Sequence, residues 1–107
     1  MPEDEFIVVL CTVPDDDCAE VLGRALVESR LAACVNALPG VRSFYRWQGE
    51  LQTADEVQLL IKTRRSHFDG LQQWMAEHHP YEVPELVAHP VAKVSDLYAQ
   101  WLREQTE

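Results

Sequence analysis

The sequence predicts an α+β domain in which an antiparallel four-stranded sheet carries two main helices on one face. Three observations favour this fold class: residues 6–13 and 56–63 have strand patterns, residues 31–47 resemble one long interrupted strand, and two intervening segments have helical periodicity. The chain has 107 residues, which is the length of one ordinary domain. We therefore expect a single domain over residues 1–107.

The first strand is expected over residues 6–13, an apolar and β-branched run whose weak alternation predicts burial on both faces. Pro14 ends this strand, and the carboxylates of residues 15–17 supply the N-cap and first turn of a helix. Along that helix, apolar or small side chains recur at helical spacing: Leu22, Ala25, Leu26 and Ser29.

A second strand is expected over residues 31–38, where Pro39-Gly40 interrupts it with a turn or bulge. The strand then continues through the aromatic residues 41–47, and residues 48–50 are a plausible hairpin turn. In the third strand, residues 56–63 alternate polar and apolar side chains, as does a strand with one solvated face.

The second helix is expected to start at Ser66, with Asp69 three residues later as a short version of the capping box. Its apolar stripe predicts that His78 faces the sheet together with the preceding members Leu71, Trp74 and Met75. Pro80 ends this helix, residues 83–91 form the last strand, and a short C-terminal helix follows. The complete order is the ferredoxin-like βαββαβ arrangement with an additional C-terminal helix.

Two helices cover only one face of a four-stranded sheet, so the other face must be polar or covered by another subunit. The long second strand carries Phe44, Tyr45 and Trp47, which a lone domain of this topology leaves partly exposed. An exposed aromatic patch of this kind indicates self-association, and we predict an oligomer.

The composition describes a globular protein with 47% hydrophobic residues, 25% charged residues and a formal net charge of −9. This charge argues against nucleic acid or an anionic membrane surface as a partner, because both require a basic face. Cys11, Cys18 and Cys34 do not form the dense, even pattern of a secreted disulfide scaffold. The acidic residues 1–5 lack signal-peptide features, so we expect a cytoplasmic protein.

Four side chains suggest a metal site: Cys11, His78, His79 and Glu85. Neutral imidazole is a common ligand of copper and zinc, and Pro80 and Pro84 reverse the chain so that Glu85 lies near the histidines. Cys11 lies on the central first strand and can approach this segment. The spacing contains neither CxxC nor HxxxH, so a core role for His78 is the common alternative.

A second set of polar residues suggests a cleft. Glu56 and Lys62 lie six residues apart on the polar face of the third strand, where they pair, line a cleft or stay solvated. Tyr81 and Glu82 follow the second helix. We predict no enzyme, because no third group orients a catalytic base and the four glycines form no phosphate loop.

The chain resembles the CutA family of divalent-cation tolerance proteins from Val8 to Trp101. The resemblance includes several ordered blocks: residues 8–15, 31–36, 43–49, 56–63 and 79–85, and Tyr98 with Trp101. It implies a ferredoxin-like fold, a homotrimer and a role in tolerance of copper and other divalent cations.

The resemblance also implies candidate ligands. Copper(II) positions of the family, where present, match Cys11, His78 and His79, with Glu85 as a further candidate and zinc as an alternative metal. The rival expectation is a PII-like trimeric module that binds a small ligand or a protein partner. In that case an intersubunit cleft with Glu56, Lys62, Tyr81 and Glu82 carries the function, and metal binding is incidental.

Overall fold

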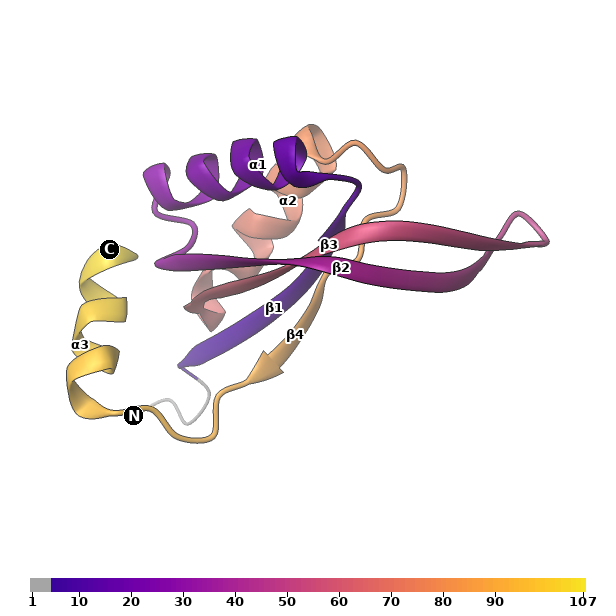
Figure 1. Ribbon diagram of the computed structural model, residues 1–107. Helices are drawn as coiled ribbons and strands as arrows, with labels where there is room; N and C mark the ends of the chain where they lie inside the picture. Colours follow the sequence, from indigo (N-terminus) through magenta and orange to yellow (C-terminus); the bar gives the residue numbers. More distant parts are fainter. Residues whose placement is uncertain (1–4) are drawn as a thin grey trace.

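The computed structural model describes residues 5–107, and the acidic residues 1–4 at the N-terminus lie outside the described part. The described chain is arranged as in Figure 1, with β1 (Phe6–Val13), α1 (Asp16–Glu28), β2 (Cys34–Trp47), β3 (Glu50–Arg64), a 3-10 turn (Arg65–His67), α2 (Phe68–His78), β4 (Val87–Pro90) and α3 (Asp96–Gln105). This order confirms the predicted ferredoxin-like α+β fold with an additional C-terminal helix. No described helix is both long and apolar enough to cross a membrane.

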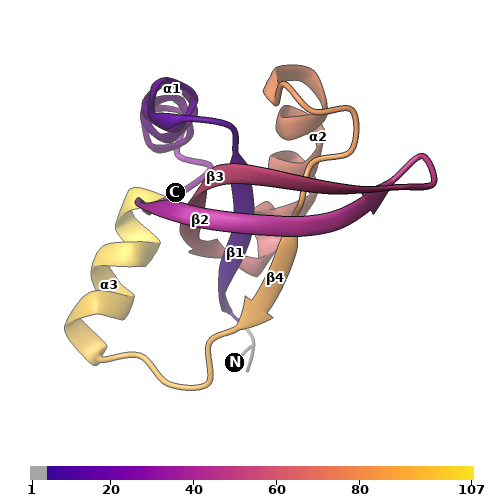
Figure 2. The same cartoon turned by 45° about the vertical axis from the view of Figure 1, so that its right-hand side comes forward.

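The strands of the described chain form one antiparallel sheet in the order β2-β3-β1-β4. Strand β1 is central, as predicted, because it pairs with β3 from Phe6 to Val13 and with β4 from Ile7 to Leu10. Helices α1 and α2 lie beside each other on one face of this sheet (Figure 1, Figure 2).

The main core lies between this face and the two helices. Alternate residues of β1 point to the helices because successive strand side chains face opposite sides: Ile7, Val9, Cys11 and Val13. They pack with Leu59 and Ile61 of β3, with Leu22 and Leu26 of α1, and with Leu71 and Met75 of α2. Full burial of one side chain of this size stabilises the fold by about 1.5–3 kcal/mol.

The opposite face of the sheet is only partly covered in one chain. Helix α3 packs over the start of β1, where Phe6, Ala33, Ala99 and Leu102 form a second buried cluster. Beyond that cluster, the alternate β1 residues Val8, Leu10 and Thr12 are half-buried. The predicted burial of β1 on both faces is therefore wrong for the single chain.

The hairpin of β2 and β3 reaches beyond the rest of the molecule (Figure 1). A register shift between Leu38 and Val41 confirms the bulge expected at Pro39-Gly40, where Gly40 has a φ of 81°. Gln48 (φ 50°) and Gly49 (φ 83°) form the predicted turn, which suits a two-residue hairpin with two positive φ angles.

The aromatic side chains of the hairpin are exposed, as predicted from the sequence. Phe44 is 66% exposed, and Tyr45, Trp47 and the apolar Leu51 also face solvent in the single chain. Because successive strand residues face opposite sides, Phe44 and Leu51 lie on one face of the hairpin and Tyr45 and Trp47 on the other. Exposed apolar side chains on both faces are the main candidates for contacts with another copy of the chain.

Two element boundaries differ from the sequence prediction. Ser66 does not cap α2: the 3-10 turn precedes the helix, its N-cap is His67 without a side-chain hydrogen bond, and the Ser66 hydroxyl lies 3.3 Å from His67 Nδ1. Strand β4 covers only Val87–Pro90 and not residues 83–91. Pro84 lacks a backbone N–H, so this part of the segment is poorly suited to continue a ladder.

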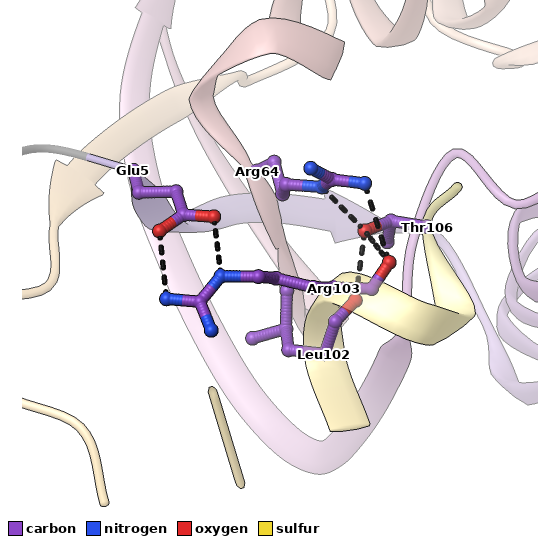
Figure 3. Close-up of polar contacts among 5 residues, drawn as sticks. All are labelled: Glu5, Arg64, Leu102, Arg103 and Thr106. Carbon is purple, nitrogen blue, oxygen red and sulfur yellow. Dashed lines mark hydrogen bonds and ion pairs between the residues drawn. The ribbon is translucent and has the colours of Figure 1, made fainter. Parts of the chain in front are cut away.

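A polar network fastens α3 and the C-terminus to the sheet (Figure 3). Arg103 donates from Nε and Nη2 to the two carboxylate oxygens of Glu5, at 2.7 and 3.0 Å. Arg64 of β3 donates to Thr106 Oγ1 at 2.9 Å and to the Arg103 carbonyl oxygen at 3.2 Å. The hydroxyl of the buried Thr106 donates to the Leu102 carbonyl oxygen. Helix α3 and this network lie at the end of the sheet away from the hairpin tip (Figure 1).

Candidate functional site

A groove of about 610 Å³ lies beside the end of β1, between the β2–β3 hairpin and the segment that follows α2. One side of the groove is the sheet face that α1 and α2 leave uncovered, since Thr12, Glu56 and Gln58 alternate with core residues, and residues 80–85 form the other side. The complete lining is Thr12, Ser43, Tyr45, Trp47, Gln48, Glu56, Gln58, Pro80, Tyr81, Glu82, Val83 and Glu85.

Glu56 and Tyr81 join the two sides of this groove. Glu56 is only 6% exposed, and the Tyr81 hydroxyl donates to its Oε2 atom at 2.6 Å. Desolvation by burial, followed by this hydrogen bond, holds the pKa of Tyr81 well above its ordinary value. The phenol therefore keeps its proton and serves as a donor to a nearly desolvated carboxylate.

His79 fastens the segment after α2 to the end of β1. Its buried ring lies between the Thr12 carbonyl oxygen, 2.9 Å from Nε2, and the Tyr81 backbone N–H, which donates to Nδ1 at 3.0 Å. These partners assign the neutral tautomer with the proton on Nε2. Both ring nitrogens are then engaged in positioning the loop.

Cys11 lies directly before Thr12 but points to the opposite face, into the main core. Burial, and to a smaller extent the charge of Glu85, raises the pKa of the Cys11 thiol to about 12. Glu85 itself lines the groove and accepts a long hydrogen bond of 3.5 Å from Gln58 Nε2. The charge of Glu85 therefore acts on Cys11 across the end of β1, with Cys11 on the core side and Glu85 on the groove side.

His78 is exposed, so the prediction that it faces the sheet is wrong. Its ring stacks on Trp74, with 4.2 Å between the ring centroids, and Nδ1 donates to the Trp74 carbonyl oxygen at 2.8 Å. The physical reason is the width of the helical stripe: Leu71 and Met75 occupy its buried centre, whereas Trp74 and His78 lie at its edge.

The structure therefore brings Cys11, His79 and Glu85 to one region and leaves His78 apart. As folded in one chain they do not fit an open metal shell, because Cys11 keeps its proton and both nitrogens of His79 have partners. Among residues 5–107, no three His, Cys, Asp or Glu side chains form a group that could hold a metal ion. The four-residue ligand set stays a prediction.

The predicted cleft residues separate in a similar way. Glu56, Tyr81 and Glu82 all line the groove, whereas Lys62 does not and instead pairs in the sheet with Val8 and Cys34. The sequence reasoning missed Tyr45 and Trp47 as groove residues, although it identified both as exposed aromatics. Their spacing of two along one strand is the signal that places them on the same face.

Comparison with known proteins gives consistent matches over almost the whole chain. A family model described as CutA1 divalent ion tolerance protein matches residues 7–105. The divalent-cation tolerance protein CutA of Pectobacterium atrosepticum is 48% identical over 101 residues, which cover 94% of this chain and 92% of that protein. The protein of the same name from Thermus thermophilus is 50% identical over 99 residues, which cover 92% of this chain and 96% of that protein.

Solved structures agree with this assignment. The crystal structure of CutA from Xylella fastidiosa matches with a TM-score of 0.92 at 40% identity, covering 96% of this chain and 99% of that chain. The divalent cation tolerance protein of Thermus thermophilus matches with a TM-score of 0.91 at 49% identity, covering 95% of this chain and 99% of that chain. This chain therefore belongs to the CutA1 divalent ion tolerance protein family.

Proposed function

We propose that this protein acts in divalent-cation tolerance as a cytoplasmic, non-enzymatic homotrimer that binds copper(II) or another divalent cation such as zinc. The proposal is supported by the positions of three side chains near one end of β1: Cys11 lies in the core there, His79 bonds to the Thr12 carbonyl oxygen, and the charge of Glu85 acts on Cys11 from the groove side. Thiolate, imidazole and carboxylate together suit a borderline cation. The names of the relatives support a role in cation tolerance, and the free state of Cys11, Cys18 and Cys34 supports a reducing compartment.

Metal binding at this place must compete with protons and with existing hydrogen bonds. The thiol of Cys11 has to lose a proton that burial retains, and His79 has to release one of its two partners. We therefore expect the affinity to be modest at neutral pH and to increase as the pH rises. Glu85 already faces the groove and is the first candidate for contact with an incoming cation.

The test is a calorimetric titration of copper(II), and separately of zinc, into metal-free protein in the presence of a competing chelator. Cys11→Ala and Glu85→Gln should each lower the affinity by at least the roughly tenfold that loss of even an outer-shell partner costs. His78→Gln decides whether the exposed histidine is also a ligand. Glu28→Gln is the matched control, because it removes one charge from an exposed position of α1, outside the groove.

An unchanged copper affinity in a Cys11→Ala, Glu85→Gln double variant would remove this site from consideration. A loss in Glu28→Gln as large as that in Glu85→Gln would likewise count against it, since the chain carries a formal charge of −9 and attracts cations non-specifically.

The homotrimer is supported by the exposed hairpin residues Phe44, Tyr45, Trp47 and Leu51 and by the half-buried face of β1. Light scattering after size-exclusion chromatography should give three times the 12.3 kDa mass of one chain. Phe44→Glu or Leu51→Glu should shift the population to smaller species, because a charge would then lie in the buried contact. A monomeric wild-type protein at micromolar concentration would contradict the assembly.

The second candidate is a PII-like trimeric module that binds a small ligand or a protein partner, with metal binding incidental. The specific observation in its favour is the groove lined by Glu56, Tyr81 and Glu82, whose volume lies in the range of small-molecule sites. Retention of a non-metal ligand by a Cys11→Ala variant that no longer binds copper would favour this candidate.

A further inference from the structure

We propose that helix α3 and the turn that follows it form a detachable cover of the sheet, which side chains from three other segments lock in place and which opens as one unit. The lock consists of Arg30, Arg64 and His67, which donate hydrogen bonds to backbone carbonyl oxygens of residues 103–106. This inference goes beyond the proposed function and is independent of the copper site at Cys11.

The last carbonyl oxygens of α3 all have hydrogen-bond partners. An α-helix leaves its last four carbonyl oxygens without an intrahelical partner. In α3 the Leu102 oxygen accepts from Thr106 Oγ1, and the oxygens of residues 103–105 accept from arginines outside the helix. Arg64 Nη2 donates to the first of these three at 3.2 Å, and Arg30 Nη1 donates to the next two at 3.2 and 3.3 Å. The positive guanidinium groups also suit the negative end of the helix dipole.

The turn after the helix is fastened in the same way. Thr106 is 1% exposed, its Oγ1 accepts from Arg64 Nε at 2.9 Å (Figure 3), and its carbonyl oxygen lies 2.6 Å from His67 Nε2. A carbonyl oxygen can only accept, so His67 carries a proton on Nε2. Arg30 follows α1, Arg64 ends β3, and His67 ends the 3-10 turn, so three separate segments converge on one helix end.

The backbone of Arg30 indicates a role for its side chain. Arg30 directly follows Ser29, the C-cap of α1, and has a φ of 65°. Glycine is the usual residue at this place, because a side chain costs free energy in the left-handed region. Backbone strain of this kind persists where the surrounding contacts impose it. Here the guanidinium group bonds to α3, 74 and 75 residues away in sequence.

Helix α3 depends on these polar contacts because its apolar attachment is small. Its buried side chains are Ala99 and Leu102, which form a cluster with Phe6 and Ala33, whereas Leu97 is 82% exposed. A helix of ten residues is not stable by itself in water. When the lock is released, α3 should therefore leave the sheet and unfold as one unit.

Opening of α3 uncovers the beginning of the second face of the sheet. Phe6 and Ala33 lose their cover, while the main core under α1 and α2 keeps its contacts on the other face. Val8 and Leu10 follow Phe6 on the same face of β1, so an open α3 extends the apolar surface that is available to another copy of the chain. The position of α3 thus regulates how much of this face is accessible.

The test is amide hydrogen exchange of the assembled protein, measured by mass spectrometry on peptides from α3 and from residues 8–13 of β1. In the wild type, α3 should be roughly tenfold or more less protected than β1, because it opens while the core stays folded. Arg30→Gly and Arg64→Met should each accelerate exchange in α3 by about tenfold, because hydrogen bonds from a charged donor are lost. The matched control Arg24→Met removes the same charge from an exposed position of α1 and should leave α3 at the wild-type rate.

A core variant separates the opening of α3 from unfolding of the whole chain. Ile61→Val weakens the main core, which stays packed when α3 alone opens, so it should accelerate exchange in β1 by about threefold and leave α3 unchanged. Equal acceleration of α3 and β1 in Ile61→Val would overturn the proposal, because α3 would then exchange through global unfolding. Unchanged α3 exchange in both Arg30→Gly and Arg64→Met would also overturn it, as would an equal effect of Arg24→Met.

Comparison of Arg30→Gly with Arg30→Ala separates the lock from the backbone strain. Both variants lose the guanidinium group and should accelerate exchange in α3 equally. Alanine keeps the left-handed strain that glycine relieves, so β1 should exchange faster in Arg30→Ala than in Arg30→Gly. Faster exchange of α3 in one of these two variants without the other would contradict the lock.

Discussion

Replacement of Cys11 by alanine should change how the stability of the protein depends on alkaline pH. The Cys11 thiol is fully buried in the main core, and burial raises its pKa from 9.0 to about 12. Between these two values the unfolded chain loses the thiol proton while the folded chain retains it. Stability contributed by the protonated thiol is thus complete below pH 9 and is lost as the pH rises toward 12.

The magnitude follows from the width of this interval. Each pH unit within it corresponds to about 1.4 kcal/mol of unfolding free energy for one group. Across the whole interval the wild type should therefore lose roughly 4 kcal/mol through Cys11, an upper value because partial opening hydrates the thiol. Cys11→Ala lacks this loss but starts about 1–2 kcal/mol less stable at pH 7, since it leaves a small core cavity.

Urea unfolding followed by tryptophan fluorescence, at one protein concentration with a thiol reductant, measures this difference from pH 8 to pH 11. The wild-type and Cys11→Ala curves should converge as the pH rises, and Cys11→Ser should show the same reduced slope. Tyr81 and Tyr98, whose pKa values burial also raises, leave a common residual slope in all three proteins. Parallel curves for the wild type and both variants would refute the reasoning.

Three further predictions concern contacts that position the fold. Arg103→Met should lower the unfolding free energy at pH 7 by removing both hydrogen bonds to Glu5. Since the hydrogen bond from Arg103 lowers the pKa of Glu5 from its ordinary value, this advantage of the wild type should be complete above that value and diminish as the pH falls below it; an equal advantage at pH 3 and pH 7 in urea unfolding would argue against it. Gly49→Ala should cost about 1–2 kcal/mol in thermal unfolding, because an L side chain at φ 83° is strained, and an unchanged midpoint would be inconsistent with the turn. Asp15→Ala should cost about 1 kcal/mol by removing the N-cap bond to the Cys18 backbone N–H at 2.8 Å, and Asp15→Asn should restore most of it; no difference between the two variants would exclude the cap as the cause.

Local sequence signals predicted the fold well where one signal determined one feature. Asp15 accepts the predicted capping bond at α1, and Pro39-Gly40 marks the observed bulge of β2. The errors occurred where two signals competed. Ser66 resembles a helix cap, but the chain continues from β3 into a 3-10 turn, and Ser66 contacts His67 instead.

The candidate site was only partly predictable, because it joins elements that are distant in sequence. The sequence analysis identified Tyr81 and Glu82 as cleft candidates and Glu85 as a metal candidate in the segment after the second helix. All three line the groove. The pairing of Tyr81 with Glu56 depends on a contact across 25 residues, which periodicity cannot supply. The prediction that His78 faces the sheet was wrong for a simpler reason: one helical stripe includes both buried and peripheral positions.

The alternation of β1 has a consequence for both binding proposals. Cys11 and Thr12 are neighbours in sequence, yet Cys11 packs in the core under α1 and α2 while Thr12 lines the groove on the opposite face. One ion held jointly by Cys11 and Glu85 would require a local opening at the end of β1, where the bond from His79 to the Thr12 carbonyl oxygen fastens the loop. Hydrogen exchange at the Tyr81 backbone amide, which donates to His79, should therefore accelerate when copper binds through Cys11 and stay unchanged when copper is added to the Cys11→Ala variant.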